Sequence, residues 1–338
     1  MDKAIKIAVD AMGGDGSPKK VIDGIIHHYK NNKDSFYKIF GDKEKIQLHI
    51  NKDLPSDAFK LIHTIEFVRG TDSPLEGAKR GKKTSMWLAI ESVKEKKSDI
   101  VISAGNTGAL LVISKLNLNM IENIDKPALS ALWPNKKGMS VVLDLGANIN
   151  CSPKNLIDFS IMGSSLFKSL YPNMDAKVAL LNIGSEEIKG NEIIKETYQQ
   201  LNKKNNQDFE FKGYIEGNQL MNGDVNVIVT DGFTGNVALK TAEGTANFIT
   251  GELKKTMTGS LIGKIASLLN FSNLKKFKAR LDPRLYNGAI FIGLDSPVIK
   301  SHGGTDYIGF SNSLSVCSRI IRANLIEKIR SNINWCLE

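Results

Sequence analysis

Residues 5–15 read IKIAVDAMGGD, a short apolar run that ends in Asp10 and is followed by the glycine pair Gly13 and Gly14. The run is typical of a buried strand, and glycines allow a tight turn whose main-chain N–H groups can face a ligand. A helix expected to begin near Pro18 would point its own free N–H groups at the same turn. Taken alone, the segment leaves two interpretations open: a cradle for a phosphate group, or a strand-to-helix turn without a ligand.

The alternation of strand and helix continues along the chain. The predicted strands are 5–9, 36–40, 61–67, 100–103, 139–143, 178–183, 225–230 and 289–292. Segments with helical spacing of apolar residues lie between them, at 86–96, 156–171, 192–201 and 313–329. This order predicts an α/β fold, a doubly wound α/β/α sandwich with a mostly parallel sheet, in a single domain over residues 1–338.

The composition is that of a globular protein with a sizeable core. Of 338 residues, 41% are hydrophobic and 24% are charged, and no run of about 18 apolar residues could span a membrane. Cys151, Cys317 and Cys336 lack the spacing of a disulfide or zinc framework, which predicts reduced thiols. Because the N-terminus also lacks a signal-peptide pattern, we expect a cytoplasmic protein.

Most of the net charge of +9 comes from one segment. Residues 251–281 contain seven Lys or Arg and a single acid, with apolar residues three or four positions apart between the lysines. The pattern predicts a protruding amphipathic helical insertion, with two helices joined near 270–272. Such an element can lie on an anionic membrane surface or pack as a hairpin against a dimer partner. The residues expected to contact the membrane are Leu261, Leu268, Leu269 and Phe271.

We expect no nucleic-acid partner, because no binding module or aromatic-basic stripe accompanies the charge.

Six predicted strand ends are followed by small, amide-rich turns. In an open parallel sheet, ligands bind at the carboxyl ends of strands, so we expect these turns to line one cleft. The turns are 10–15, 103–108, 144–148, 182–186, 231–236 and 301–304.

Several common signatures of catalysis are absent from the sequence. It contains no GxxxxGK[ST], GxGxxG, GxSxG or HExxH motif, and its five histidines have no ligand spacing. We therefore expect neither a nucleotide cofactor nor a metal, and no serine nucleophile. The remaining chemistry is that of an enzyme that binds small anions with amides, hydroxyls and a few cations, and that acts by positioning and charge stabilisation.

Six motifs occur in order along nearly the whole chain: DAMGGD (10–15), SAGNTGA (103–109), DLGAN (144–148), KGNE (189–192), DGFTGNV (231–237) and SHGG (301–304). Together they resemble the acyl-acyl-carrier-protein:phosphate acyltransferase family of bacterial phospholipid synthesis. The resemblance implies a fold like that of phosphotransacetylases and isocitrate dehydrogenases, and a homodimer. It also implies a reaction in which acyl-acyl carrier protein (acyl-ACP) and inorganic phosphate give acyl phosphate and free ACP. The product would feed a glycerol-3-phosphate acyltransferase at the membrane. Gly16 departs from the family pattern, which often has His or Phe there, and this puts the shape of the first turn in question.

The resemblance implies that Lys189 and Asn236 are the catalytic pair. Phosphate at neutral pH is partly dianionic and can attack a thioester without a strong protein base. The site must then supply placement, and donors for the negative charge on the carbonyl oxygen. Lys189 lies at an expected helix start and Asn236 at the helix entry after Gly235. The alternatives are a solvated surface lysine and a helix N-cap.

Other residues of the turns are expected to hold phosphate or substrate oxygens. They are Asp10, Gly13, Gly14, Asn106, Thr107, Gly108, Asp144, Asn148, Asp231, Gly232, Thr234, Gly235, His302 and Gly303. We expect the three aspartates to orient turn amides, because an unpaired carboxylate would repel phosphate. His302 is either a general base or a structural hydrogen-bonding residue. A separate cluster of Arg80, Lys82 and Lys83 is either a docking site for the acidic carrier protein or a solvated helix face.

Two other functions remain open from the sequence. One is phosphotransacetylase-like transfer from acyl-CoA, and the other is a non-catalytic regulator that binds acyl-ACP or a phospho-ligand. The apolar insertion at 251–281 argues against a short-chain CoA enzyme, which needs no acyl- or membrane-facing element.

Overall fold

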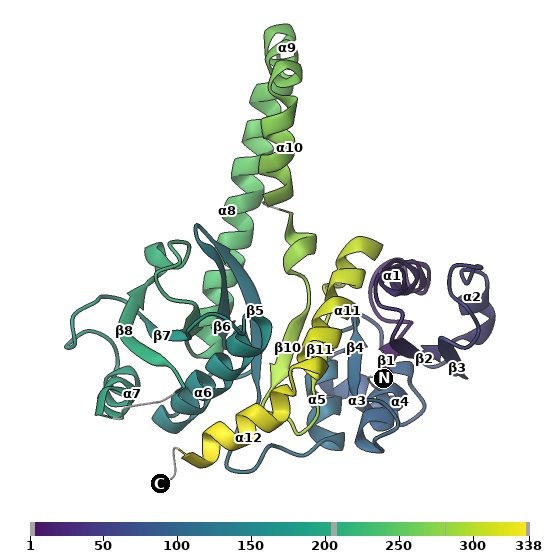
Figure 1. Cartoon of the computed structure of the whole chain (residues 1–338), viewed down its shortest axis with the longest axis horizontal. Coiled ribbons are helices and arrows are strands. Elements are labelled where there is room, and N and C mark those ends of the chain that lie inside the picture. The colour runs from purple at the N-terminus through teal and green to yellow at the C-terminus, as the bar shows by residue number, and fades with distance from the viewer. Residues whose placement is uncertain (1–3, 204–207, 281, 336–338) are drawn as a thin grey trace.

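The computed structural model describes residues 4–203, 208–280 and 282–335 (Figure 1). Within them, eleven strands form one sheet flanked by helices. The strands are β1 (Ile5–Asp10), β2 (Ser35–Gly41), β3 (Phe59–His63), β4 (Ile100–Ser103), β5 (Ala128–Asn135), β6 (Gly138–Leu143), β7 (Lys177–Asn182), β8 (Glu210–Glu216), β9 (Val227–Val229), β10 (Ala289–Ile292) and β11 (Val298–Lys300). The α-helices are α1 (Lys19–Tyr29), α2 (Lys43–Gln47), α3 (Pro74–Lys79), α4 (Ser85–Lys94), α5 (Thr107–Asn117), α6 (Pro153–Leu170), α7 (Glu192–Lys203), α8 (Gly232–Thr258), α9 (Leu261–Leu269), α10 (Phe271–Arg280), α11 (Tyr307–Arg322) and α12 (Leu325–Trp335). Two short 3-10 helices are η1 (Gly217–Gln219) and η2 (Pro283–Tyr286).

The sheet contains two parallel halves that run in opposite directions. Its order is β3-β2-β1-β4-β11-β10-β5-β6-β9-β7-β8. The first five strands are parallel to one another, and so are the last four. Between them, β10 and β5 each pair antiparallel with both neighbours. The predicted doubly wound α/β/α sandwich with a mostly parallel sheet is confirmed, but the carboxyl ends of its two halves lie at opposite edges.

Helices cover both faces of the sheet, and the alternation of strand residues divides the core between them. One face carries α1, α6, α7, α11 and α12, and the other carries α3, α4, α5 and the first turns of α8. Val9 and Ile102 belong to the core of the first face, whereas Ala8 and Val101 belong to that of the second. Burial on both faces explains why these strands are continuous apolar runs.

Most predicted elements are present, with three strands missed and two boundaries wrong. The strand predicted at 61–67 ends at His63, and the helix predicted at 313–329 is two helices, separated where Asn324 takes a positive φ of 51°. The missed strands are β5, β8 and β11. β5 contains a proline, β8 is rich in charged residues and β11 has only three residues, so none of them gives a clear apolar run.

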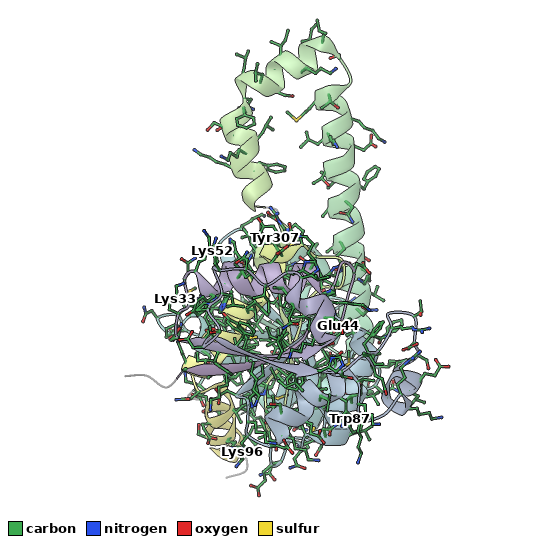
Figure 2. All side chains as sticks on the ribbon, turned by 90° about the vertical axis from the view of Figure 1, so that its right-hand side faces the viewer. Lys33, Glu44, Lys52, Trp87, Lys96 and Tyr307 are labelled. Atoms are coloured by element: carbon green, nitrogen blue, oxygen red, sulfur yellow. The ribbon has the colours of Figure 1, made fainter. Side chains whose placement is uncertain are left out.

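A helical arm, formed by residues 244–280 of α8, α9 and α10, projects from the body (Figure 1). In Figure 2 the side chains of the arm stand clear of the body, with Tyr307 on the side from which the arm projects and Trp87 and Lys96 toward the other end. The predicted junction of two helices near 270–272 is present, but α8 runs unbroken for 27 residues to Thr258, so the projecting part begins before residue 251. Leu281 lies outside the described residues.

Among the described residues, no helix has both the length and the apolar character needed to cross a membrane. Cys151 and Cys317 are free thiols, and Cys336 lies outside the described part of the chain.

His28 should make the protein sensitive to acid. It lies near the end of α1 and is buried against β2, where its Nδ1 forms a hydrogen bond of 2.6 Å with the Tyr37 hydroxyl. Burial, with the charge of Arg322, lowers the pKa of His28 from 6.5 to about 4. Below pH 6.5, His28 binds a proton in the unfolded chain but stays neutral in the native state. The free energy of unfolding that is present above pH 6.5 is therefore lost as the pH falls toward 4. The loss is roughly 3 kcal/mol.

Urea unfolding at pH 7 and pH 4 measures this effect. A His28→Gln variant should lose less unfolding free energy between these two pH values than the unaltered protein. The partly exposed His49, changed to Gln, is the matched control. An equal loss in the His28→Gln variant would contradict the assignment.

Candidate active site

The six amide-rich turns form two groups rather than one. At the first edge of the sheet, β1, β4 and β11 lead into the turns 10–15, 103–108 and 301–304. At the opposite, second edge, β6, β7 and β9 lead into the turns 144–148, 182–186 and 231–236. The strands that lead into the six turns therefore do not all end at one edge, because the antiparallel strands β10 and β5 reverse the direction of the sheet between the groups.

Asp144 organises the second edge. Its buried carboxylate accepts the main-chain N–H groups of Leu129, Gly146, Ala147 and Asn148 at 2.7–3.2 Å, and the Asn148 side-chain amide at 2.8 Å. Burial raises the pKa of Asp144, while these hydrogen bonds act in the opposite direction. Asp144 therefore orients turn amides, as expected of it. The Asn148 amide nitrogen also donates to the Pro127 carbonyl at 2.7 Å, so its hydrogens serve the fold.

The start of α8 packs directly on the 144–148 turn. The Gly232 N–H donates to the Asn148 carbonyl at 2.7 Å, and a Cβ on Gly235 would overlap the carbonyl oxygen of Asp144. Only glycine allows this close approach. It sets Asn236 against Gly146, where a Cβ on the glycine would lie 3.6 Å from the Asn236 Cβ.

Asp231, and not Asn236, is the N-cap of α8. Its carboxylate accepts the Thr234 N–H and the Thr234 hydroxyl, both at 2.8 Å. The alternative interpretation of Asn236 as the cap is therefore wrong. Its side chain is exposed and has no hydrogen-bond partner in the described part of the protein, so it can receive a substrate.

Lys189 lies in the loop between β7 and α7, three residues before the helix begins. The Asn182 side chain donates to the Lys189 carbonyl at 3.1 Å, and Gly190, with φ of 96°, packs against Asn182. The main chain is thus fixed, while the Lys189 side chain is exposed and makes no ion pair within the described ranges. Because β7 and β9 are parallel neighbours, Lys189 and Asn236 rise from the same edge.

Exposed apolar side chains occur in the same turns and helix starts as Lys189 and Asn236. Ile149, Ile183, Ile188, Phe233 and Val237 come from all three turns and from α8, and each is at least half exposed. A pocket of about 300 Å³ opens beside them between α6, α7 and α8. Its lining includes Ile149, Cys151, Ile193, Asp231, Phe233 and Thr234.

Asp10 is the counterpart of Asp144 at the first edge. Its carboxylate is fully buried and accepts the hydroxyls of Ser85 and Ser103, both at 2.7 Å, and the Met12 N–H at 3.2 Å. Burial raises the pKa of Asp10, and the two serine hydroxyls oppose the rise. The carboxylate therefore joins the turns after β1 and β4 to the start of α4.

Glycines shape the first turn. A Cβ on Gly13 would lie 2.5 Å from the Gly105 nitrogen, and Gly14 has a φ of 83°. Gly16 also has a positive φ, 68°, but faces open space. A Cβ at position 16 would meet nothing within 4 Å, so the positive φ is the constraint that the structure shows on a residue other than glycine.

The other predicted residues of this edge are divided between structure and surface. The Asn106 side chain caps α5 through the Ala109 N–H at 3.0 Å and donates to the Gly70 and Asp72 carbonyls. Thr107 is exposed, and Gly108 packs on Pro74.

His302 links the two edges electrostatically. Its Nδ1 accepts the Gly304 N–H at 3.2 Å, and burial, with the charge of Lys300, lowers its pKa. Glu243 and Lys240 of α8 also act on this pKa, so α8 passes close to the first edge. Asn236 precedes these two residues by seven and four positions, about 6–10 Å along the helix axis. A single helix therefore runs past both groups of turns.

The proposed docking cluster is only partly available. Arg80 makes a bidentate pair with Asp72, with N–O distances of 2.5 and 2.8 Å, so its guanidinium ties the end of α3 to the preceding loop. Lys82 and Lys83 are exposed.

Comparisons with known proteins show the family of the chain. The model of the family described as fatty acid synthesis protein matches residues 5–328. A phosphate acyltransferase of Pelagibacter ubique is 85% identical over 98% of this chain and 100% of its own. The chain belongs to the phosphate acyltransferase family. A further member, from Rhodospirillum rubrum, is 43% identical over 98% of this chain and 95% of its own.

Solved structures confirm the fold. A phosphotransacetylase from Streptococcus pyogenes superposes with a TM-score of 0.63 at 15% identity, covering 97% of this chain and 95% of its own. The EutD phosphotransacetylase from Staphylococcus aureus gives a TM-score of 0.60 at 16% identity, covering 96% and 94%. The family resemblance noted in the sequence motifs is thus confirmed, and the protein is an acyltransferase of lipid synthesis.

Removing the Asp144 carboxylate should destabilise the protein strongly. Asp144→Ala leaves several buried N–H groups without an acceptor, at about 1–3 kcal/mol for each group that stays unsatisfied. We expect a loss of about 3 kcal/mol or more in urea unfolding. Asp42→Ala, which removes the cap of the short exposed helix α2, is the control and should cost about 1 kcal/mol. Equal losses in the two variants would contradict the role given to Asp144.

Proposed function

We propose that the enzyme transfers an acyl group from acyl-ACP to inorganic phosphate, releasing acyl phosphate and the free carrier thiol. The observation that carries the proposal is the pair of exposed, unpartnered polar side chains, Lys189 and Asn236, on fixed main chain at one edge. Family membership supports the reaction class.

The chemistry needs donors rather than a strong base. A phosphate oxygen attacks the thioester carbonyl carbon, the carbonyl oxygen becomes negative, and the C–S bond then breaks as the C=O bond re-forms. The carrier sulfur leaves as a thiolate and takes a proton from solvent. The Lys189 ammonium and the Asn236 side-chain amide donate to the developing oxyanion, each worth about 2.7–4 kcal/mol in comparable sites.

The apolar side chains around the pair favour a long acyl donor. Ile183, Ile188 and Phe233 expose between 63% and 81% of their surface next to the donors, where an acyl chain can cover them. A short-chain CoA thioester gains little from such a surface. Lys82 and Lys83 remain candidates for docking the acidic carrier, with Arg80 holding their loop in place.

Phosphate-dependent release of ACP thiol from acyl-ACP, with hydroxylamine capturing the acyl phosphate, tests the reaction. Lys189→Ala and Asn236→Ala should each lower kcat by about 10²–10³, because one oxyanion donor is lost. Lys195→Ala, a nearby lysine paired with exposed Glu192, is the control and should keep the wild-type rate. Wild-type protein that releases no thiol on addition of phosphate would end the enzyme proposal. Full turnover in both variants would refute only the site.

We also propose that the arm holds the enzyme to an anionic membrane surface, where the product passes to a glycerol-3-phosphate acyltransferase. Leu261, Leu268, Leu269 and Phe271 are 63–84% exposed, Lys264 lies between them in the sequence, and the exposed Lys275 and Lys276 follow in α10. Apolar insertion and attraction to anionic lipid then act together. The homodimer that the family resemblance implies would cover the outer part of α8, where Phe248 and Ile249 are exposed.

Replacing Leu268 and Leu269 with Glu should release the protein from anionic vesicles in a flotation assay, because two carboxylates would have to enter the lipid surface. Turnover in solution should stay close to wild type. Leu48→Glu, an equally exposed leucine on the body, is the control. If the double variant still binds vesicles, the membrane proposal is contradicted, and the apolar surface of the arm is assigned to contact with the partner subunit instead.

A further inference from the structure

Two lysines are buried at the first edge of the sheet, and neither belongs to the motifs discussed above as catalytic. Lys20 lies in the first turn of α1 and Lys300 is the last residue of β11, and each side chain is in a residue only 8% exposed. The Lys20 ammonium donates to the Gly303 carbonyl and the Lys300 ammonium to the Ser301 carbonyl. In the part of the chain that the structure describes, neither forms an ion pair with a carboxylate.

The charges around the two lysines do not balance. The charge of Asp10 raises the pKa of Lys300 and the charge of Asp15 raises that of Lys20, while Lys20 lowers the pKa of Lys300 and both lysines lower the pKa of His302. The oxygens of Asp10 are already occupied by two serine hydroxyls and an N–H group, and Asp15 is exposed to solvent. Two buried cations therefore share one buried carboxylate, which lies beyond ion-pair distance.

Such an arrangement is unfavourable unless a further anion joins it. An ammonium has three donor hydrogens, and each of these lysines uses one on a main-chain carbonyl. Burial of an unpaired cation costs several kcal/mol and favours loss of its proton. In agreement, burial lowers the pKa of Lys300 to about 8.

The glycine turn packs closely on the Lys20 ammonium. A Cβ on Gly14 would lie 2.9 Å from the Lys20 Nζ and 2.8 Å from the Ala104 carbonyl oxygen, so the glycine turn passes directly over the ammonium. The Gly303 carbonyl also accepts the Asp15 N–H at 3.0 Å, which joins the turns 10–15 and 301–304 above the lysine. Gly14 and Gly303 are half-buried while His302 is exposed, so the cluster borders the surface.

We propose that Lys20 and Lys300 bind the phosphoryl group of a small dianion between the turns 10–15 and 301–304, and that this dianion is free inorganic phosphate, the acyl acceptor. The inference rests on the proposed function and assigns a binding site to its second substrate, inorganic phosphate. A phosphopantetheine phosphate is a diester with a single negative charge, so two buried ammonium groups suit the smaller inorganic dianion better. The phosphate would then lie on the side of α8 that also presents Asn236 to the thioester.

The test compares two variants of the full-length protein with a matched control. Lys20→Met and Lys300→Met remove the charge and keep the length of the side chain. Lys19→Met changes the neighbouring residue, which is exposed and pairs with Asp23. Calorimetry and ³¹P NMR measure binding of inorganic phosphate, and thiol release gives separate KM values for phosphate and for acyl-ACP.

Each lysine variant should weaken phosphate binding and raise the KM for phosphate by about ten- to a hundredfold, the value of one charge-assisted hydrogen bond. The KM for acyl-ACP should change less than about twofold, and the Lys19→Met protein should match wild type. Unchanged phosphate affinity in the lysine variants overturns the inference, and so does a rise confined to the KM for acyl-ACP, which would assign the lysines to phosphopantetheine.

Two features keep this test decisive. If Lys300→Met does not fold, as judged by circular dichroism, Lys20→Met gives the same comparison from a helix residue outside the sheet. Failure of the proposed function is a separate result: wild-type protein would release no thiol with phosphate, whereas phosphate binding by calorimetry would still report on the two lysines.

Discussion

The reversal of strand direction at the centre of the sheet is the constraint on which the arrangement of this protein depends. Because β10 and β5 pair antiparallel with their neighbours, the parallel halves end at opposite edges, and each edge collects three of the six turns. A substrate that needs both edges must be reached by an element that runs between them. That element is α8, which begins at the second edge and passes close enough to the first for Lys240 and Glu243 to act on the pKa of His302.

The two buried aspartates show how acidic groups can surround an anion site without repelling the anion. Asp10 ends β1 and Asp144 follows β6, one in each half of the sheet, and each is saturated by hydroxyl or N–H donors. Their oxygens face inward onto the turns, so the turns keep their shape. The cations are placed differently, with Lys189 exposed on its loop and Lys20 and Lys300 buried under the glycine turn. Exposure suits a donor to a bulky thioester, and burial suits a small ion.

The sequence predicted those features that depend on local pattern. Apolar runs gave the buried strands of both halves, and the motif residues gave Lys189 and Asn236 through the family resemblance. It did not predict the reversal, because β5 and β11 carry weak local signals and strand direction is decided by pairing between distant segments. It also missed Lys20, since its burial depends on Gly303, 283 residues away. The lysine directly after the glycine turn was the available signal, yet nothing local distinguishes it from Lys19, which is exposed.

Because α8 is long, it connects the arm directly to the second edge of the sheet, where Lys189 and Asn236 lie. Its first turn is held against the 144–148 turn by Gly232 and Gly235, which permit no side chain at the contact. The same helix continues for 27 residues, about 40 Å, into the exposed arm. A rigid helix transmits its orientation along its whole length, so the direction in which the arm projects is determined at the contact that also places Asn236. On the proposed lipid surface, the arm would hold the second edge at a fixed height above the lipid, and the proposed acyl phosphate would leave near the phase in which its chain is soluble.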